Sequence, residues 1–221
     1  MAFTDELFTR AQPIWDAQLA HPFVIGLGDG SLPEARFRNW ICQDYLYLKD
    51  FARIFAWAVA KSDRLESMGW YAGVLHLTLN TEMALHREYA NGFGIPAAEL
   101  ETTPLWPTTR AYVDFLLRTA ADGDMADLTA VLLPCSWGYV YVAQHLAARS
   151  AGSKHRYTDW IVQYVSPEFV DAAEWLKGET NRLADGLSAQ KRERLLSLFE
   201  TSSRYEWQFW EMCWHGERWP V

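Results

Sequence analysis

The residues best suited to chemistry lie in the segment 132–139, which reads LLPCSWGY and places a cysteine directly after a proline. Cys135 and Tyr139 are four residues apart, so on a helix their side chains project from one face. Pro134 lacks an N–H group, so a helix must either begin or kink there. A beginning would place Cys135 among free amide groups that favour a thiolate. The alternative is a buried cysteine that behaves as a small hydrophobic residue.

A carboxylate interrupts an apolar helical stripe further upstream. Trp40, Asp44, Tyr47 and Phe51 are spaced by four, three and four residues, so they share one helix face. An ionised carboxylate buried without a partner is costly. Asp44 is therefore either a ligand-binding group or the partner of a buried arginine such as Arg53.

Two further residues have the spacing of metal ligands. Glu82 and His86 are four residues apart and could hold a metal ion on one helix face. A carboxylate-bridged di-iron site also needs Glu-x-x-His pairs, and the sequence has none. The pattern therefore favours a hydrogen-bonded pair or a solvated face over a metal site.

The remaining candidates are polar residues within apolar helices: Tyr112, Tyr164 and Glu206. Glu206 and Glu211 lie near the end of the chain: we expect one of them to be nearer the core, and the alternative is that both lie on the rim of a solvated face. A cysteine beside a carboxylate that acts as acid and base can add to an electron-poor ring and later be expelled. Aromatic walls would hold such a ring flat, although each tyrosine alone also fits an ordinary core position.

Composition limits the classes of function. The chain has 221 residues, half of them hydrophobic, which predicts one domain over residues 1–221. Its 12 Trp, 10 Tyr and 11 Phe indicate a bulky core or an aromatic pocket. The formal net charge of -8 argues against nucleic acid as a partner.

Cysteine usage and hydropathy predict the compartment. Cys42, Cys135 and Cys213 are widely separated and odd in number, so no disulfide framework is indicated and a reducing cytoplasm is expected. The first residues lack the pattern of a signal peptide, and no apolar run approaches the length of a membrane span.

The periodicity predicts an all-α bundle of about seven helices with few strand signals. We expect a first helix capped by Thr4 and kinked or divided at Pro13, followed by a loop containing Gly26, Gly28 and Gly30. Later helices are expected over about residues 31–62, 65–89, 107–122, 124–152, 157–164, from 167 onward, and from a Ser188 cap to about 214.

Five stretches resemble the TenA/thiaminase II family in the expected order: residues 21–23, 40–47, 132–139, 157–164 and 205–212. The resemblance implies a haem oxygenase-like single compact helical bundle and a homotetramer. It also implies a hydrolase of thiamin salvage, without metal or organic cofactor. The implied reaction converts 4-amino-5-aminomethyl-2-methylpyrimidine to the hydroxymethylpyrimidine and ammonia, with thiamin cleavage as a related activity.

The same resemblance implies a role for each matching residue. Cys135 is the implied nucleophile, and Glu206 the general acid and base. Asp44 is implied to hydrogen-bond the amino group and an adjacent ring nitrogen of the pyrimidine. The aromatic residues implied to stack on the ring, or to hydrogen-bond it and the thiol, are Tyr47, Tyr112, Tyr139 and Tyr164. One departure is Val142-Ala143, where the family often has Ile-Gly, and it bears on helix packing.

Two other functions stay open at this point. A di-iron oxygenase of the same fold would use Glu82 and His86. A non-catalytic protein would bind a pyrimidine, or haem with His21 as the axial ligand.

Overall fold

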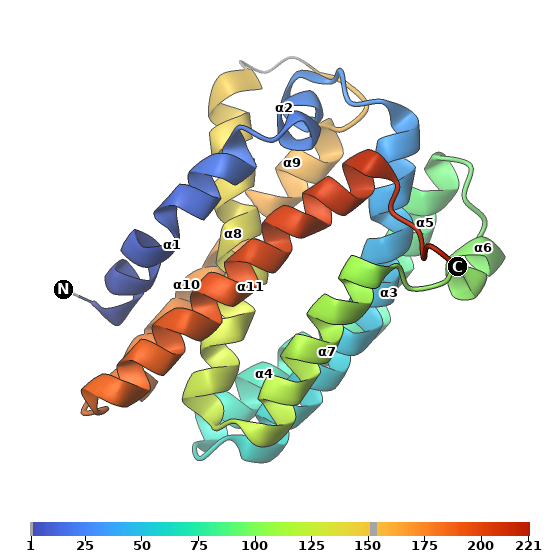
Figure 1. Cartoon of the computed structure of the whole chain (residues 1–221). Coiled ribbons are helices and arrows are strands. Elements are labelled where there is room, and N and C mark those ends of the chain that lie inside the picture. The colour runs from blue at the N-terminus through green and yellow to red at the C-terminus, as the bar shows by residue number, and fades with distance from the viewer. Residues whose placement is uncertain (1, 151–153) are drawn as a thin grey trace. The chain divides into compact units, whose positions relative to one another are not determined.

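The computed structural model describes residues 2–150 and 154–221, and every regular element in them is helical (Figure 1). The all-α prediction is therefore confirmed. The chain divides into two compact units, each built from two stretches. Unit 1 is Met1–Pro33 with Ala126–Glu211, and unit 2 is Glu34–Met125 with Met212–Val221. The single domain over residues 1–221 stays a prediction.

Unit 1 contains most of the long helices that carry tryptophan. Its elements are α1 (Phe3–Leu19), α2 (Pro22–Asp29), nearly all of α8 (Met125–Ser150), α9 (Thr158–Tyr164), α10 (Pro167–Ala184) and most of α11 (Ala189–His215). Trp15 of α1 donates its indole N–H to the Ser203 hydroxyl of α11 over 3.0 Å. Trp210 donates to the Gln18 side chain over 3.1 Å. These bonds satisfy buried N–H groups whose loss of water would otherwise cost about 1–3 kcal/mol each.

The beginning of the chain differs from the prediction. Ala2, not Thr4, is the N-cap of α1, and the Asp5 carboxylate accepts the Ala2 backbone N–H over 2.9 Å. Pro13 lies inside α1 and does not divide it. The prediction of a glycine loop is wrong, because Gly26 and Gly28 belong to α2.

The two glycines of α2 are required by packing. A Cβ on Gly26 would lie 2.9 Å from the Leu32 backbone, and one on Gly28 would lie 2.6 Å from the Leu146 side chain. Gly30 ends the helix with a φ of 82°, a conformation that glycine adopts at little cost.

Unit 2 is organised along α3 (Glu34–Lys61), whose predicted bounds are confirmed to within a few residues. Its other elements are α4 (Leu65–Leu77), η1 (Thr78–Glu82), α5 (Met83–Gly92), α6 (Ala97–Thr102) and α7 (Pro107–Asp122). The Gln43 side chain of α3 accepts the Trp106 backbone N–H over 3.0 Å and the Thr109 hydroxyl over 2.7 Å. This buried amide therefore holds the beginning of α7 against α3.

The helix predicted over residues 65–89 contains an element that the sequence did not reveal. The π-helical segment η1 stands between α4 and α5 without a break. A π segment bonds each N–H to a carbonyl five residues back, so it adds a residue to the turn and rotates α5 relative to α4. This rotation sets which α5 side chains face α3.

Candidate active site

Cys135 lies within α8, because this helix begins at Met125 and continues through Pro134. The alternative in which Pro134 starts a helix is therefore wrong, and Cys135 is not in a first turn. Its thiol donates to the Leu132 carbonyl over 2.9 Å and is half-buried. Cys42 and Cys213 are buried, and burial raises the pKa of Cys42 and, well above its usual value, that of Cys213. Of the three cysteines, Cys135 is the one with partial access to solvent.

Two contacts fix the register of α8 against α11 within unit 1. The Ser202 hydroxyl donates to the Val131 carbonyl over 2.8 Å, and the Trp210 ring lies 5.4 Å from the Tyr139 ring. Both contacts join residues whose numbers differ by 71, so the helices run in the same direction at this point (Figure 1).

The two predicted catalytic residues lie midway between these contacts. The numbers of Cys135 and Glu206 also differ by 71. Cys135 lies one turn before Tyr139, and Glu206 lies one turn before Trp210. They therefore lie at one level of two helices packed together. Glu206 is 3% exposed, whereas the Glu211 side chain is 40% exposed, so the prediction that one carboxylate is nearer the core is confirmed.

An aromatic cluster adjoins this level of unit 1. The Tyr139 ring lies 5.0 Å from the Tyr164 ring and 5.9 Å from the Trp160 ring. Trp160 and Tyr164 are 4.7 Å apart. The two tyrosines are candidates that the sequence already indicated. Trp160 and Trp210 were not among those candidates, although Trp210 follows Glu206 by four residues on the same helix.

In unit 2, Asp44 is 5% exposed and faces a histidine rather than an arginine. The Nδ1 atom of His86 lies 3.7 Å from Oδ2 of Asp44. Arg53 is exposed and pairs with Asp50 instead, so the suggested pair of Asp44 with Arg53 is wrong.

His86 is also not the partner of Glu82. Its Nε2 atom lies 2.8 Å from the Ile41 carbonyl, while the Thr78 hydroxyl hydrogen-bonds Glu82. The expectation of a hydrogen-bonded Glu82–His86 pair is therefore wrong. His86 is buried rather than on a solvated face, and Glu82 is half-buried. Removal of water from the Glu82 carboxyl raises its pKa. In the residues that the structure describes, no group of three or more His, Cys, Asp or Glu is arranged to hold a metal ion.

The two tyrosines predicted to bind the ring in unit 2 lie side by side. The Tyr47 ring of α3 is 5.4 Å from the Tyr112 ring of α7, with 31° between their planes. Both side chains are nearly buried. Unit 1 thus gathers Cys135, Tyr139, Tyr164 and Glu206, and unit 2 gathers Asp44, Tyr47 and Tyr112.

His21 has a structural role at the beginning of α2. Its Nδ1 atom accepts the Phe23 N–H over 3.1 Å, and its Nε2 atom lies 2.9 Å from the Glu211 carboxylate. Both ring nitrogens are therefore engaged, which argues against His21 as an axial haem ligand.

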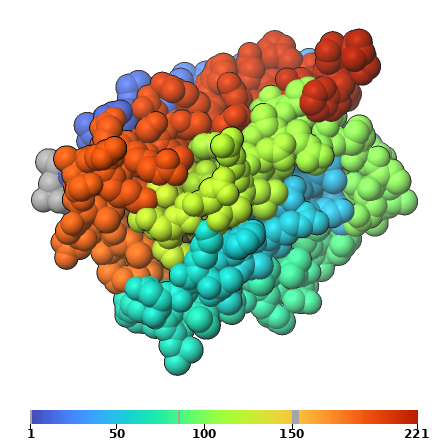
Figure 2. All heavy atoms as spheres, turned by 60° about the horizontal axis from the view of Figure 1, so that its bottom comes forward, coloured from blue at the N-terminus to red at the C-terminus, as the bar shows by residue number. Residues whose placement is uncertain are grey.

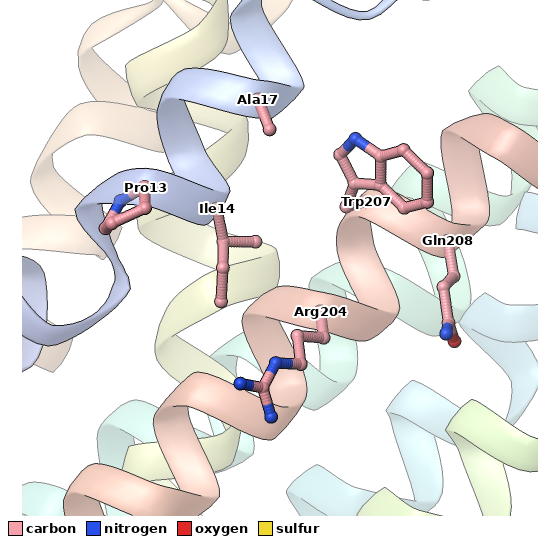
Figure 3. A pocket seen from close by; sticks show the side chains of 6 residues that line it. All are labelled: Pro13, Ile14, Ala17, Arg204, Trp207 and Gln208. Carbon is pink, nitrogen blue, oxygen red and sulfur yellow. The ribbon is translucent and has the colours of Figure 1, made fainter.

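A surface pocket of about 370 Å³ opens between α1 and α11 in unit 1 (Figure 3). Pro13, Ile14 and Ala17 line one side. Arg204, Trp207 and Gln208 line the other. Its lining contains no thiol, carboxylate or imidazole, so it lacks the nucleophile and the acid and base that the sequence predicts for the active site. Among residues 2–150 and 154–221, no helix has the length and hydropathy to cross a membrane.

The fold belongs to the haem oxygenase-like class of all-α proteins. A solved domain with a heme oxygenase-like fold from Shewanella denitrificans matches 96% of this chain and 92% of its own with a TM-score of 0.75. At 14% identity, this similarity bears on the fold alone.

Family membership follows from more specific matches. The model of the TENA/THI-4/PQQC family matches residues 8–216, so this chain belongs to that family. An aminopyrimidine aminohydrolase from Halalkalibacterium halodurans is 43% identical over 220 residues, covering 99% of this chain and 98% of the relative. A solved TenA homologue from P. horikoshii has a TM-score of 0.89 at 27% identity, covering 98% of this chain and 100% of its own.

Proposed function

We propose that this protein is an aminopyrimidine aminohydrolase of thiamin salvage. It hydrolyses 4-amino-5-aminomethyl-2-methylpyrimidine to the 5-hydroxymethyl compound and ammonia. The observation that carries the proposal is the 43% identity to a protein of that name over nearly the whole of both chains. Cleavage of thiamin to the same pyrimidine and its thiazole is a related activity, because both reactions replace a leaving group on the same methylene carbon.

In the proposed mechanism, Cys135 and Glu206 carry out the bond changes. The Cys135 sulfur adds to the pyrimidine ring as its proton passes to a ring nitrogen, and the electron-rich adduct expels ammonia with a proton from Glu206. Glu206 then takes a proton from water, whose oxygen bonds to the methylene carbon. Expulsion of the sulfur, which takes back the proton from the ring nitrogen, restores the aromatic ring, so the net change is exchange of an amine for a hydroxyl group. The common level of Cys135 and Glu206 on α8 and α11 supports this division of roles.

Binding of the pyrimidine is assigned to a carboxylate and four phenols. Asp44 accepts the hydrogen bond from the amino group of the ring, as a charged acceptor that strengthens such a bond. Tyr47, Tyr112, Tyr139 and Tyr164 supply stacking surfaces and hydroxyl groups. The nucleophile and the acid and base are side chains, so the proposal includes no cofactor.

Parallel assays of ammonia release from the aminopyrimidine and of thiamin cleavage test the function. We expect ammonia release, with a loss of roughly 10²-fold or more in Glu206→Gln because a general acid and base contributes about that much. Glu211→Gln is the matched control on the same helix and should keep turnover below its melting temperature. A wild-type protein that releases no ammonia and cleaves no thiamin would refute the proposal.

We further propose a homotetramer in the cytoplasm. The apolar surface of α4 and η1 supports the assembly, since Leu65 is 84% exposed, Leu77 57% and Leu79 54%. Figure 2 shows the beginning of α4 at the surface, in cyan. Contiguous apolar patches on a protein surface commonly mark interaction sites. The three free cysteines suit a reducing compartment. Light scattering at micromolar concentration should give the tetramer mass, and a monomer mass would contradict the assembly.

A further inference from the structure

The orientation of the His86 ring is determined by its hydrogen bond to α3. Its Nε2 atom lies 2.8 Å from the backbone carbonyl of Ile41. A carbonyl oxygen can only accept, so Nε2 carries the hydrogen. The opposite nitrogen, Nδ1, is thereby directed at Asp44, 3.7 Å from Oδ2. The side chains of His86 and Asp44 are only 8% and 7% exposed.

The surrounding elements leave this imidazole little freedom. Its ring lies 6.0 Å from Trp40 and 5.9 Å from Tyr45, both on α3. The π-helical segment η1, which ends four residues before His86, sets the face that α5 presents to α3. Such segments are uncommon and frequent at functional sites, because they re-aim the side chains that follow.

The direction of the Asp44 carboxylate depends on the groups packed against it. The terminal torsion of an aspartate is broad, so the carboxylate group rotates unless its surroundings select one orientation. Nδ1 of His86 acts on that rotation in either protonation state. A protonated Nδ1 attracts Oδ2, and an unprotonated Nδ1 presents a lone pair that keeps Oδ2 beyond hydrogen-bond distance.

We propose that His86 is a positioning residue for Asp44: held by the Ile41 carbonyl, it fixes the direction in which the Asp44 carboxylate meets the amino group of the pyrimidine. The inference rests on the proposed function, because it requires Asp44 to bind substrate. His86 acts through Asp44 and touches no reacting atom.

Two substitutions test the contacts of the two ring nitrogens of His86 separately. His86→Gln places an amide nitrogen near the former Nε2, where it can donate to Ile41, but removes the group that faces Asp44. His86→Asn places an amide near the former Nδ1 and loses the bond to Ile41. His76→Gln, at an exposed position of α4, is the matched control.

The measurements are KM and kcat for ammonia release, the affinity for hydroxymethylpyrimidine by calorimetry, and the melting temperature. We expect His86→Gln to raise KM and weaken binding roughly tenfold, because it misdirects the hydrogen bond from the pyrimidine amino group to the charged Asp44 carboxylate. The kcat should change less than about threefold. His86→Asn should lose less affinity than His86→Gln, because it keeps a group that faces Asp44, but should not reach the wild-type affinity and should melt at a lower temperature, because it loses the bond to Ile41. His76→Gln should resemble the wild type.

A double-mutant cycle with Asp44→Asn decides whether His86 acts through Asp44. We expect His86→Gln to have no further effect on affinity in the Asp44→Asn background. A full tenfold effect in that background, or equal losses of affinity in His86→Gln and His86→Asn, overturns the positioning role while leaving Asp44 as a binding residue. Unchanged pyrimidine binding in Asp44→Asn overturns both this inference and the proposed role of Asp44.

Discussion

Replacement of Cys135 by serine separates the chemistry of the thiol from its packing. The Cys135 thiol is half-buried and donates to the Leu132 carbonyl over 2.9 Å, a bond that a serine hydroxyl can also make. Stability should therefore change by less than about 1 kcal/mol, or roughly 2–4 °C in melting temperature. The hydroxyl is a much weaker nucleophile than a thiolate, so turnover should fall roughly 10²-fold or more, which corresponds to about 2.7 kcal/mol of activation free energy.

Cys213→Ser and Cys42→Ser are the matched controls. Cys213 is 0% exposed, so a hydroxyl group there would be buried at a cost of about 1–3 kcal/mol and lower the melting temperature by several degrees. Turnover in both controls should stay near that of the wild type at temperatures where they are folded. The assay is ammonia release per folded protein, with melting temperatures from circular dichroism. Near-native turnover in Cys135→Ser would show that Cys135 is a packing residue and that the covalent mechanism is wrong.

Three further outcomes are expected. Asp44→Asn should weaken hydroxymethylpyrimidine binding roughly tenfold or more, because a charged acceptor becomes neutral, and calorimetry that shows equal affinity would contradict this. Burial raises the pKa of Glu82 in the folded protein, so the protonated carboxyl contributes to stability. This contribution is fully present below about pH 4.3 and is lost as the pH rises through the pKa of Glu82 in the folded protein. Glu82→Gln should therefore match the wild type near pH 4 and melt higher at pH 7–8; a constant difference in melting temperature across this pH range would refute the argument. Gly26→Ala should lower stability by about 1–3 kcal/mol because its Cβ would meet the Leu32 backbone, while Gly178→Ala, with open space around it, should raise it by up to about 1 kcal/mol; similar melting temperatures for the two would contradict this.

Much of the helical framework could be predicted from the sequence, because its signals are local. Pro107 begins α7 and Pro167 begins α10, as expected for a residue without an N–H to bond. The Ser188 hydroxyl accepts the Lys191 N–H at the beginning of α11, which confirms that cap. Local spacing also identified Cys135 with Tyr139, and Asp44 with Tyr47, as residues that share a helix face.

Other features depended on atoms that are distant in the sequence. Pro134 lies inside α8, although a proline often ends a helix. Gly26 lies in α2, where the close approach of the Leu32 backbone leaves no room for a Cβ. The sequence left open whether Asp44 pairs with an arginine or binds a ligand. The structure places His86 beside Asp44, on α5, whose rotation about its axis is set by the π-helical segment η1.

The register between helices was likewise decided by tertiary structure alone. Periodicity specifies which face of a helix is apolar, but not which turn of one helix lies beside which turn of another. The bond from Ser202 to Val131 and the packing of Trp210 on Tyr139 specify that alignment. They place Glu206 beside the level of Cys135, because side chains far apart in sequence become neighbours only when the helices pack.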